Sequence, residues 1–220
     1  SAAHCYDNDK DGQLDFAFNR FPHVAAFELA DRTEILRLAT SQTSIPEQFG
    51  EIPADIAVLT LEEAAPPDIP RYSLDDTTDV VGATVVISGY GATGSGEQGM
   101  VPGVDDTPTK RAGLNRYEAL RDGSPFPGLE LFVYDFDSGS DEANALALYG
   151  FESDLGLGAD EAKSAIGDSG APSFLDGAIA GVVSFGGMEF DGDTNPAVNG
   201  TWGELGFDTR VSRFQLFLTD

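Results

Sequence analysis

Short apolar runs separated by turn residues dominate the pattern of hydrophobic and polar positions along the chain. Four of these runs are rich in β-branched and aromatic residues: 55–61 (DIAVLTL), 82–91 (GATVVISGYG), 129–136 (LELFVYDF) and 177–186 (GAIAGVVSFG). Turn signals interrupt the chain throughout, since it contains 26 Gly and 12 Pro. Short strands at this spacing are typical of a sandwich or a barrel. The pattern therefore predicts an all-β protein.

The last segment has a helical period instead. Val211, Phe214 and Leu218 follow the i, i+3, i+7 spacing of one helix face, and Asp208 or Thr209 is suited to cap the first turn. This spacing predicts a short C-terminal helix that packs on the β body.

Two other segments are less regular. Residues 27–39 (FELADRTEILRLA) fit a helix and a strand equally well, and both assignments stay open. Residues 91–110 (GATGSGEQGMVPGVDDTPTK) have the Gly-rich composition of a long mobile loop.

Composition and charge narrow the class of protein. The chain has 220 residues, a hydrophobic content of 41% and 15 Phe, which together favour a folded globule with a sizeable core. The formal charge of −26 repels nucleic acid and anionic lipid, so neither is expected as a partner. No apolar run approaches the roughly 18–20 residues of a membrane span. Such an acidic surface fits an exported protein, a salt-tolerant protein or one that binds divalent cations.

The strongest candidate for chemistry is Ser169 in GDSGAPSF, residues 167–174. A serine nucleophile needs an exposed hydroxyl and backbone N–H groups that face the developing oxyanion, and flanking Gly167 and Gly170 permit both. The alternative is an ordinary Asp-Ser-Gly turn between two strands.

A serine nucleophile also needs a base and an acid that orients the base. His4 and His23 are the two histidines in the chain, and His4 stands in SAAHC. Asp55 begins the apolar run ADIAVLTL. Each residue taken alone also fits a structural role, His4 as an ordinary histidine and Asp55 as the start of a strand.

Together these local patterns resemble the trypsin/chymotrypsin family of serine endopeptidases, in the type found in exported bacterial proteins. The family carries an AAHC-type histidine motif, a D-I-A-[LV]-L aspartate motif and a GDSGGP serine motif, in this order. Three further stretches are similar to family motifs: SGYG (88–91), GVVSFG (181–186) and LGFDTRVSRF (205–214). The resemblance spans nearly the whole chain, although Ala171 replaces the second glycine of the serine motif.

The resemblance implies a double β-barrel with a short C-terminal helix. Residues 1–80 would form the remainder of the N-terminal barrel, and residues 81–220 would form the C-terminal barrel and the helix. The first strands of the N-terminal barrel are not found upstream of the histidine motif, so the chain is expected to be an N-terminally truncated fragment.

The resemblance also implies a mechanism. Ser169 would attack the scissile carbonyl, His4 would take and return the proton, and Asp55 would orient His4. The N–H groups of Gly167 and Ser169 would form the oxyanion hole, and no cofactor would be required. A protein or peptide would be the substrate.

Three more expectations come from the family. Asp168 would pair with an amino terminus released from a zymogen, which Ser1 cannot supply because it lies three residues from His4. Asp168 would then stay unpaired, and the chain would be weakly active. Cys5, the only cysteine, would form a disulfide with a cysteine in an upstream segment, in a protein that is secreted, periplasmic or on the cell surface.

The resemblance places a substrate pocket as well. Its walls would be Ser184, Phe185, Gly186 and Gly206, whose small members would leave the pocket open. Lys163 stands where trypsin-like members carry an aspartate, which argues against cleavage after Arg or Lys. Lys163 would then favour acidic substrates, or face water, or Glu161 would take part if the alignment shifts.

The acidic stretches suggest a structural calcium ion. In DNDKDGQLD the residues Asp7, Asp9, Asp11 and Asp15 are spaced like the start of a calcium loop, although Phe18 stands where an EF-hand has Glu. Residues 134–144 and 191–195 are similar acidic clusters. The alternative for all three is a solvated loop.

Two other functions compete with the peptidase. One is a pseudopeptidase that keeps the scaffold for binding. The other is an acidic, calcium-dependent adhesion or surface module.

Overall fold

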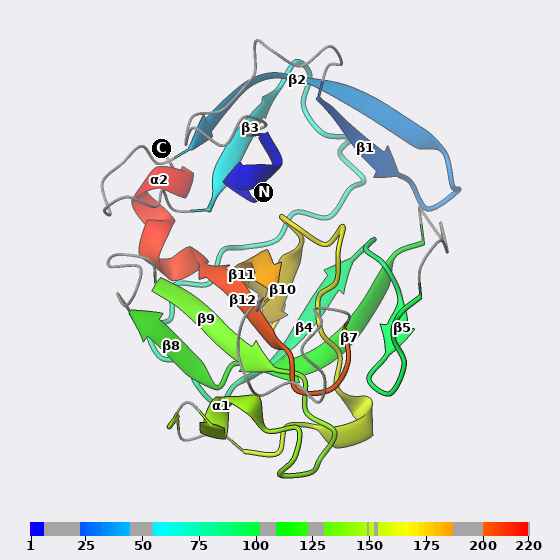
Figure 1. Ribbon diagram of the computed structural model, residues 1–220. Helices are drawn as coiled ribbons and strands as arrows, with labels where there is room; N and C mark the ends of the chain where they lie inside the picture. Colours follow the sequence, from blue (N-terminus) through cyan, green and yellow to red (C-terminus); the bar gives the residue numbers. More distant parts are fainter. Residues whose placement is uncertain are drawn as a thin grey trace.

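The computed structural model of the chain is built mainly from antiparallel β-sheets (Figure 1). The structure describes residues 1–6, 23–44, 55–101, 109–122, 130–148, 150–151, 154–186 and 200–219. The predicted all-β class is confirmed. No helix in these described ranges is both long and apolar enough to cross a membrane.

The N-terminal part forms a three-stranded sheet in the order β1-β2-β3. Its elements are the 3-10 helix η1 (Ala3–Tyr6) and the strands β1 (Val24–Glu28), β2 (Glu34–Ser44) and β3 (Ala57–Leu61). The ambiguous segment 27–39 is a hairpin, because Asp31 Oδ1 accepts a hydrogen bond from the Thr33 N–H and Arg32 has a φ of 67°. Turn chemistry at these residues decides for strand over helix.

A seven-stranded sheet forms the larger part, in the order β7-β4-β10-β11-β12-β9-β8. Its strands are β4 (Thr84–Gly89), β7 (Arg111–Arg116), β8 (Ala119–Asp122), β9 (Glu130–Asp135), β10 (Pro172–Leu175), β11 (Ala178–Gly186) and β12 (Leu205–Arg210). The four predicted apolar runs are confirmed as β3, β4, β9 and β11. The segment expected as a loop carries a small ribbon, β5 (Gly94–Ser95) with β6 (Gly99–Met100). The division at residues 80 and 81 stays a prediction.

Short helices complete the described structure. They are α1 (Ala145–Leu148), η2 (Gly158–Asp160), η3 (Val211–Phe214) and α2 (Gln215–Thr219). The predicted C-terminal helix is confirmed as η3 followed by α2. Its predicted cap is wrong, because Arg210 occupies the N-cap position and makes no side-chain cap hydrogen bond. Asp208 and Thr209 lie in β12 and are fully buried.

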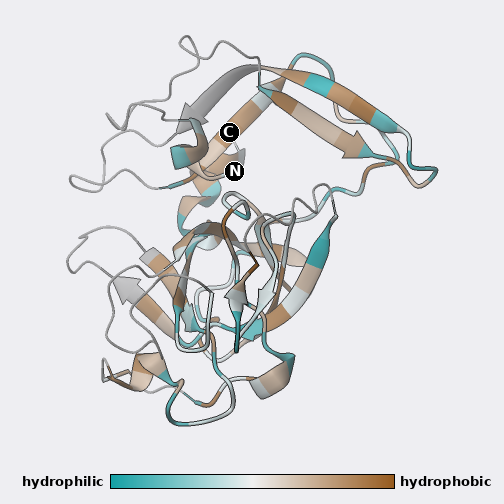
Figure 2. Cartoon of the chain, turned by 45° about the vertical axis from the view of Figure 1, so that its right-hand side comes forward, coloured by the Kyte–Doolittle hydropathy of each residue, from teal (hydrophilic) through white to brown (hydrophobic). Residues whose placement is uncertain are grey.

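An apolar cluster joins the N-terminal sheet to the larger sheet. Ile56, Val182, Val211 and Phe214 pack together and are at most 7% exposed. Burial of such side chains contributes about 1.5–3 kcal/mol each. The strand that follows Asp55 is therefore held against β11 and the C-terminal helix. Figure 2 shows that hydrophobic residues also lie along β1 and β2, where Leu36 is 55% exposed.

Candidate active site

Backbone hydrogen bonds place the His4 segment beside Asp55. The Ala57 N–H donates to the Ser1 carbonyl at 2.7 Å, and the Ser1 amino group donates to the Ala57 carbonyl at 3.0 Å. The N-terminal segment thus continues as the 3-10 helix η1 alongside β3, and the His4 backbone N–H reaches Asp55 Oδ1 at 2.9 Å. Two residues 51 positions apart are brought into contact.

The His4 ring and the Asp55 carboxylate form an ion pair. His4 Nδ1 lies 2.7 Å from Asp55 Oδ2, which also accepts a hydrogen bond from the Ser184 hydroxyl. Hydrogen bonds from the His4 ring to Asp55 and Cys5 raise the pKa of His4 to about 10. Burial alone would raise the pKa of Asp55, but the hydrogen bonds from His4 and Ser184 hold it below its usual value. The carboxylate therefore orients the ring and stabilises its protonated form.

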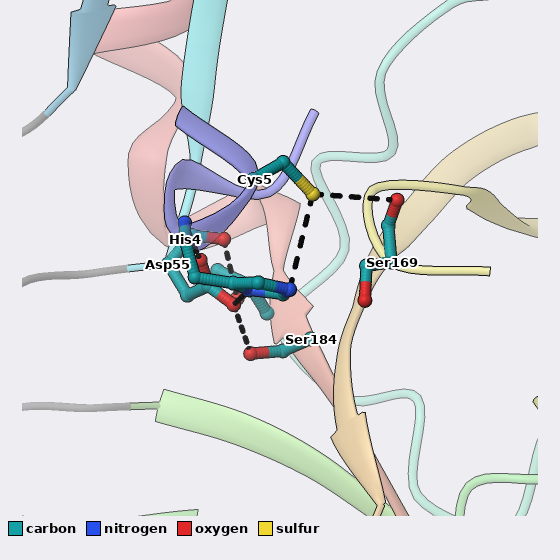
Figure 3. Close-up of polar contacts among 6 residues, drawn as sticks. His4, Cys5, Asp55, Ser169 and Ser184 are labelled. Atoms are coloured by element: carbon teal, nitrogen blue, oxygen red, sulfur yellow. Dashed lines mark hydrogen bonds and ion pairs between the residues drawn. The ribbon is translucent and has the colours of Figure 1, made fainter. Parts of the chain in front are cut away.

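Ser169 lies across from the His4 ring, and Cys5 stands between them (Figure 3). The Cys5 thiol donates to the Ser169 carbonyl at 3.7 Å, and its sulfur lies 3.8 Å from His4 Nε2. Among the described residues, no hydrogen bond joins the Ser169 hydroxyl to His4. Cys5 is an exposed free thiol. Its sulfur contacts His4 Nε2, the ring nitrogen that would have to accept the proton of a serine nucleophile.

The turn around Ser169 leaves two backbone donors free. Gly167 has a φ of 97°, which favours glycine, and the Gly167 and Ser169 N–H groups donate to no acceptor within the described part of the chain. The next N–H groups are used, since Gly170 donates to Val183 at 2.8 Å and Ala171 donates to Asp168 at 2.8 Å. This turn offers the kind of donors that an oxyanion hole requires.

Asp168 is half-buried and hydrogen-bonded to backbone donors, while its pairing with a released amino terminus stays a prediction. Its carboxylate accepts the Gly91 N–H at 2.7 Å and the Ala165 N–H at 2.9 Å. A Cβ at Gly89 would lie 2.0 Å from Asp168 Oδ1, so any other residue there would displace this carboxylate. Two backbone donors satisfy this carboxylate without a released amino terminus.

Two predicted walls of the substrate pocket lie next to this site on β11. Ser184 is 2% exposed and donates to Asp55, a contact that the sequence pattern did not suggest. Phe185 is 41% exposed and stacks on Phe207, with ring centroids 4.6 Å apart. Thr209, on β12, donates its hydroxyl to the Asp55 carbonyl at 3.1 Å.

The two glycine walls have different surroundings. A Cβ at Gly206 would lie 2.2 Å from the Tyr134 ring, so this glycine makes room for a buried aromatic side chain rather than for substrate. A Cβ at Gly186 would lie 3.6 Å from Lys163 Nζ. The ammonium group of Lys163 therefore lies close to the β11 end of the predicted pocket.

Lys163 forms a buried ion pair. Its Nζ lies 3.0 Å from Glu204 Oε2, and the side chains of Lys163 and Glu204 are 8% and 2% exposed. The alternative in which Lys163 faces water is wrong. The acidic partner Glu204 was missed, because no local pattern distinguishes it from the other 37 acidic residues of the chain.

A pocket with a volume of about 520 Å³ opens beside this pair. Lys163, Glu161 and Asp168 border it, together with Gly91 and Trp202. Glu161 is thus a pocket residue, and its carboxylate accepts the Asp137 N–H at 2.6 Å.

The predicted calcium loop lies outside the described residues, since it consists of Asp7, Asp9, Asp11 and Asp15. Calcium binding there stays a prediction. A different group, Glu118, Asp135 and Asp137, brings its carboxylate oxygens within 4.8 Å of one another. Asp135 and Asp137 belong to the acidic run 134–144, for which the sequence leaves a cation-binding cluster and a solvated loop as alternatives.

The comparisons with known proteins support the fold. No protein-family model and no curated protein matches the sequence. Among solved structures, the chain is similar to neuropsin, a serine protease expressed in the limbic system of mouse brain, with a TM-score of 0.57. The similarity covers 99% of this chain and 81% of the neuropsin chain, at 16% sequence identity. The predicted trypsin-like fold with its short C-terminal helix is confirmed.

Proposed function

We propose that this protein is a serine endopeptidase that hydrolyses peptide bonds through an acyl-enzyme intermediate. The observation that carries the proposal is the His4–Asp55 pair at 2.7 Å, which faces Ser169 on a glycine turn with two unused N–H donors. The trypsin-like fold supports a protease and a protein or peptide substrate.

Each residue has a role that its contacts support. Ser169 Oγ attacks the carbonyl carbon, and His4 Nε2 takes the hydroxyl proton and later returns it to the leaving amine. Asp55 keeps the opposite ring nitrogen, Nδ1, protonated and oriented, while Ser184 and Thr209 hold Asp55 in place. The Gly167 and Ser169 N–H groups stabilise the oxyanion. The acyl-enzyme is then hydrolysed by water along the same proton path.

The site has to tighten before this reaction. Catalytic hydrogen bonds are often long without substrate and shorten in the bound complex. Here the Cys5 sulfur must leave His4 Nε2 for Ser169 to approach the ring. We therefore expect slow turnover from this chain, for a reason different from the unpaired Asp168 that the sequence suggested.

A fluorophosphonate probe, which reacts with an activated serine, tests the proposal. The wild-type protein should be labelled and Ser169→Ala should not, while His4→Ala should label at least 100-fold more slowly. Ser73→Ala, which removes an exposed serine outside the site, serves as the matched control and should label like wild type. Equal labelling of wild type and Ser169→Ala would refute the assignment.

A catalytically impaired binding module is the second candidate. The contact of Cys5 with His4 Nε2, and the lack of a Ser169–His4 hydrogen bond among the described residues, favour it. This candidate predicts no labelling by the probe together with normal thermal stability.

We also propose that the protein works outside the cytoplasm, as the resemblance implies and as its acidic charge permits. Fractionation of cells that express the gene tests this location. Recovery of the protein only in the cytoplasm would contradict it.

A further inference from the structure

A buried acidic cluster lies apart from the proposed catalytic residues. We define it by Glu118, which precedes β8, Asp135 at the end of β9, and Asp137. These residues are 7%, 1% and 0% exposed, and one carboxylate oxygen from each lies within 4.8 Å of the other two. Three carboxylates this close inside a protein repel one another strongly unless a positive charge joins them.

The carboxylate of Asp137 accepts no hydrogen bond from the described part of the chain. Within the same ranges Asp135 Oδ1 also lacks a donor, although all three oxygens are buried. Asp135 Oδ2 is satisfied by the Leu146 N–H at 2.8 Å. Buried acceptors are almost always satisfied in native proteins, so three orphaned oxygens that face one cluster call for a ligand.

The protein side chains nearby do not balance the charge. Asp154 and Glu161 adjoin the cluster, since the Asp154 N–H donates to Glu118 and Glu161 accepts from the Asp137 N–H. Arg116 pairs with Asp154. In this part of the described structure, a single guanidinium group therefore lies near five carboxylates.

The pKa values of two cluster residues agree with the lack of a positive charge beside them. Burial, followed by the nearby carboxylates, raises the pKa of Glu118 and of Asp137 well above the usual range of a carboxyl group. A bound cation would reverse this shift and keep both groups ionised.

The donor set indicates which ion fits. All donors are carboxylate oxygens, and the cluster contains no histidine or cysteine, which favours a hard cation over zinc. Calcium takes six to eight oxygen ligands at about 2.3–2.6 Å, whereas magnesium usually keeps several waters and takes one or two carboxylates. Three carboxylates that each place an oxygen within 4.8 Å of the others therefore favour calcium.

We propose that Glu118, Asp135 and Asp137 bind one calcium ion. The ion would join β8 and β9 to the segment that leads to Ser169, because Glu161 precedes this segment and hydrogen-bonds to the cluster. Helix α1, which contacts the cluster through Leu146, lies at the opposite end of the molecule from β1–β3 (Figure 1). The ion is structural in this proposal and takes no part in catalysis.

The close approach of Gly156 to the cluster supports a preformed ion-binding site. Gly156 has a φ of 59°, and a Cβ there would lie 2.5 Å from Glu161 Oε2 and 2.8 Å from Asp137 Cβ. The absent side chain lets the chain pass close to the carboxylates. Any larger residue would force the carboxylates to move.

Thermal unfolding of the EDTA-treated full chain, with and without CaCl₂, tests the proposal. Calcium at about 100 times its Kd should raise the Tm by roughly 5–10 °C. Asp137→Asn should abolish this rise, and in EDTA it should be at least as stable as wild type because it removes an unpaired charge. A merely structural carboxylate would give no calcium dependence in any variant.

Controls separate this site from the predicted loop and from general effects. Asp9→Asn, in the predicted calcium loop, and Asp141→Asn, an exposed residue after the cluster, should both keep the rise. If Asp137→Asn does not fold, Glu118→Gln provides the same comparison. No rise in wild type, a full rise in Asp137→Asn, a rise lost in Asp9→Asn, or a rise with MgCl₂ alone would each overturn the proposal. None of these results depends on peptidase activity.

Discussion

Loss of Lys163 alone should strongly destabilise the protein, because its partner Glu204 would remain buried, and Lys163→Met tests this. The substitution keeps an unbranched side chain of similar length but leaves Glu204 buried without its partner, at 2% side-chain exposure. Removing one partner of a buried pair costs about 3–5 kcal/mol, because the remaining charge is desolvated and uncompensated. For a chain of this size, that loss corresponds to a decrease in Tm of roughly 6–20 °C.

The control is the double variant Lys163→Met/Glu204→Gln, which removes both charges. It should recover most of the lost stability, because the amide can still accept the Gly200 N–H that now binds Glu204 Oε1 at 2.7 Å. The assay is urea unfolding followed by circular dichroism, with the free energies combined in a double-mutant cycle.

The reasoning fails if Lys163→Met costs less than about 1 kcal/mol, the effect expected of a solvent-exposed pair. It also fails if the double variant is no more stable than Lys163→Met. A large loss in the single variant with recovery in the double variant would mean that Glu204 neutralises Lys163. Lys163 would then not select acidic substrates.

Three further predictions concern the proposed catalytic residues and the core. Asp55→Asn should lower kcat by about 10⁴-fold, because the amide cannot stabilise the protonated His4 ring; peptide hydrolysis measures this, and a loss below tenfold contradicts the pairing. Because hydrogen bonds from the His4 ring to Asp55 and Cys5 raise the pKa of His4 to about 10 and a base must be neutral, kcat/KM should increase as the pH rises above neutrality. Cys5→Ala should move this acid limb to lower pH, and a wild-type limb near pH 6.5 would contradict the argument. Gly181→Ala should destabilise the fold by about 1–3 kcal/mol in urea unfolding, since its Cβ would lie 2.2 Å from the buried Tyr117 hydroxyl.

The strands could be predicted because their signals are local. Runs such as 84–89 and 178–186 combine β-branched residues with flanking turn residues, and both became strands. Residues 27–39 were ambiguous because their apolar spacing fits two periods. The Asp31 turn decides between them, and its effect depends on a single hydrogen bond to Thr33.

Other local signals were misleading. Asp208 has the residue type of a helix cap, but it is buried in β12, where it accepts hydrogen bonds from Tyr117 and Ser173 at 2.6 Å. The acidic run around Asp135 and Asp137 has the composition of a solvated loop, yet both carboxylates are buried. Composition does not reveal which face of the chain will be covered.

Turn preferences and apolar spacing within short stretches of the chain were enough to predict the all-β class of fold. The selection of His4, Asp55 and Ser169 as one set depended in addition on the resemblance of their motifs to a known family. The partners of Asp168, the pairing of Lys163 with Glu204 and the position of Cys5 emerged only from the folded chain. Each of these contacts joins segments far apart in sequence or depends on the exact path of the backbone, and its energy is decided by burial, which short-range patterns do not encode.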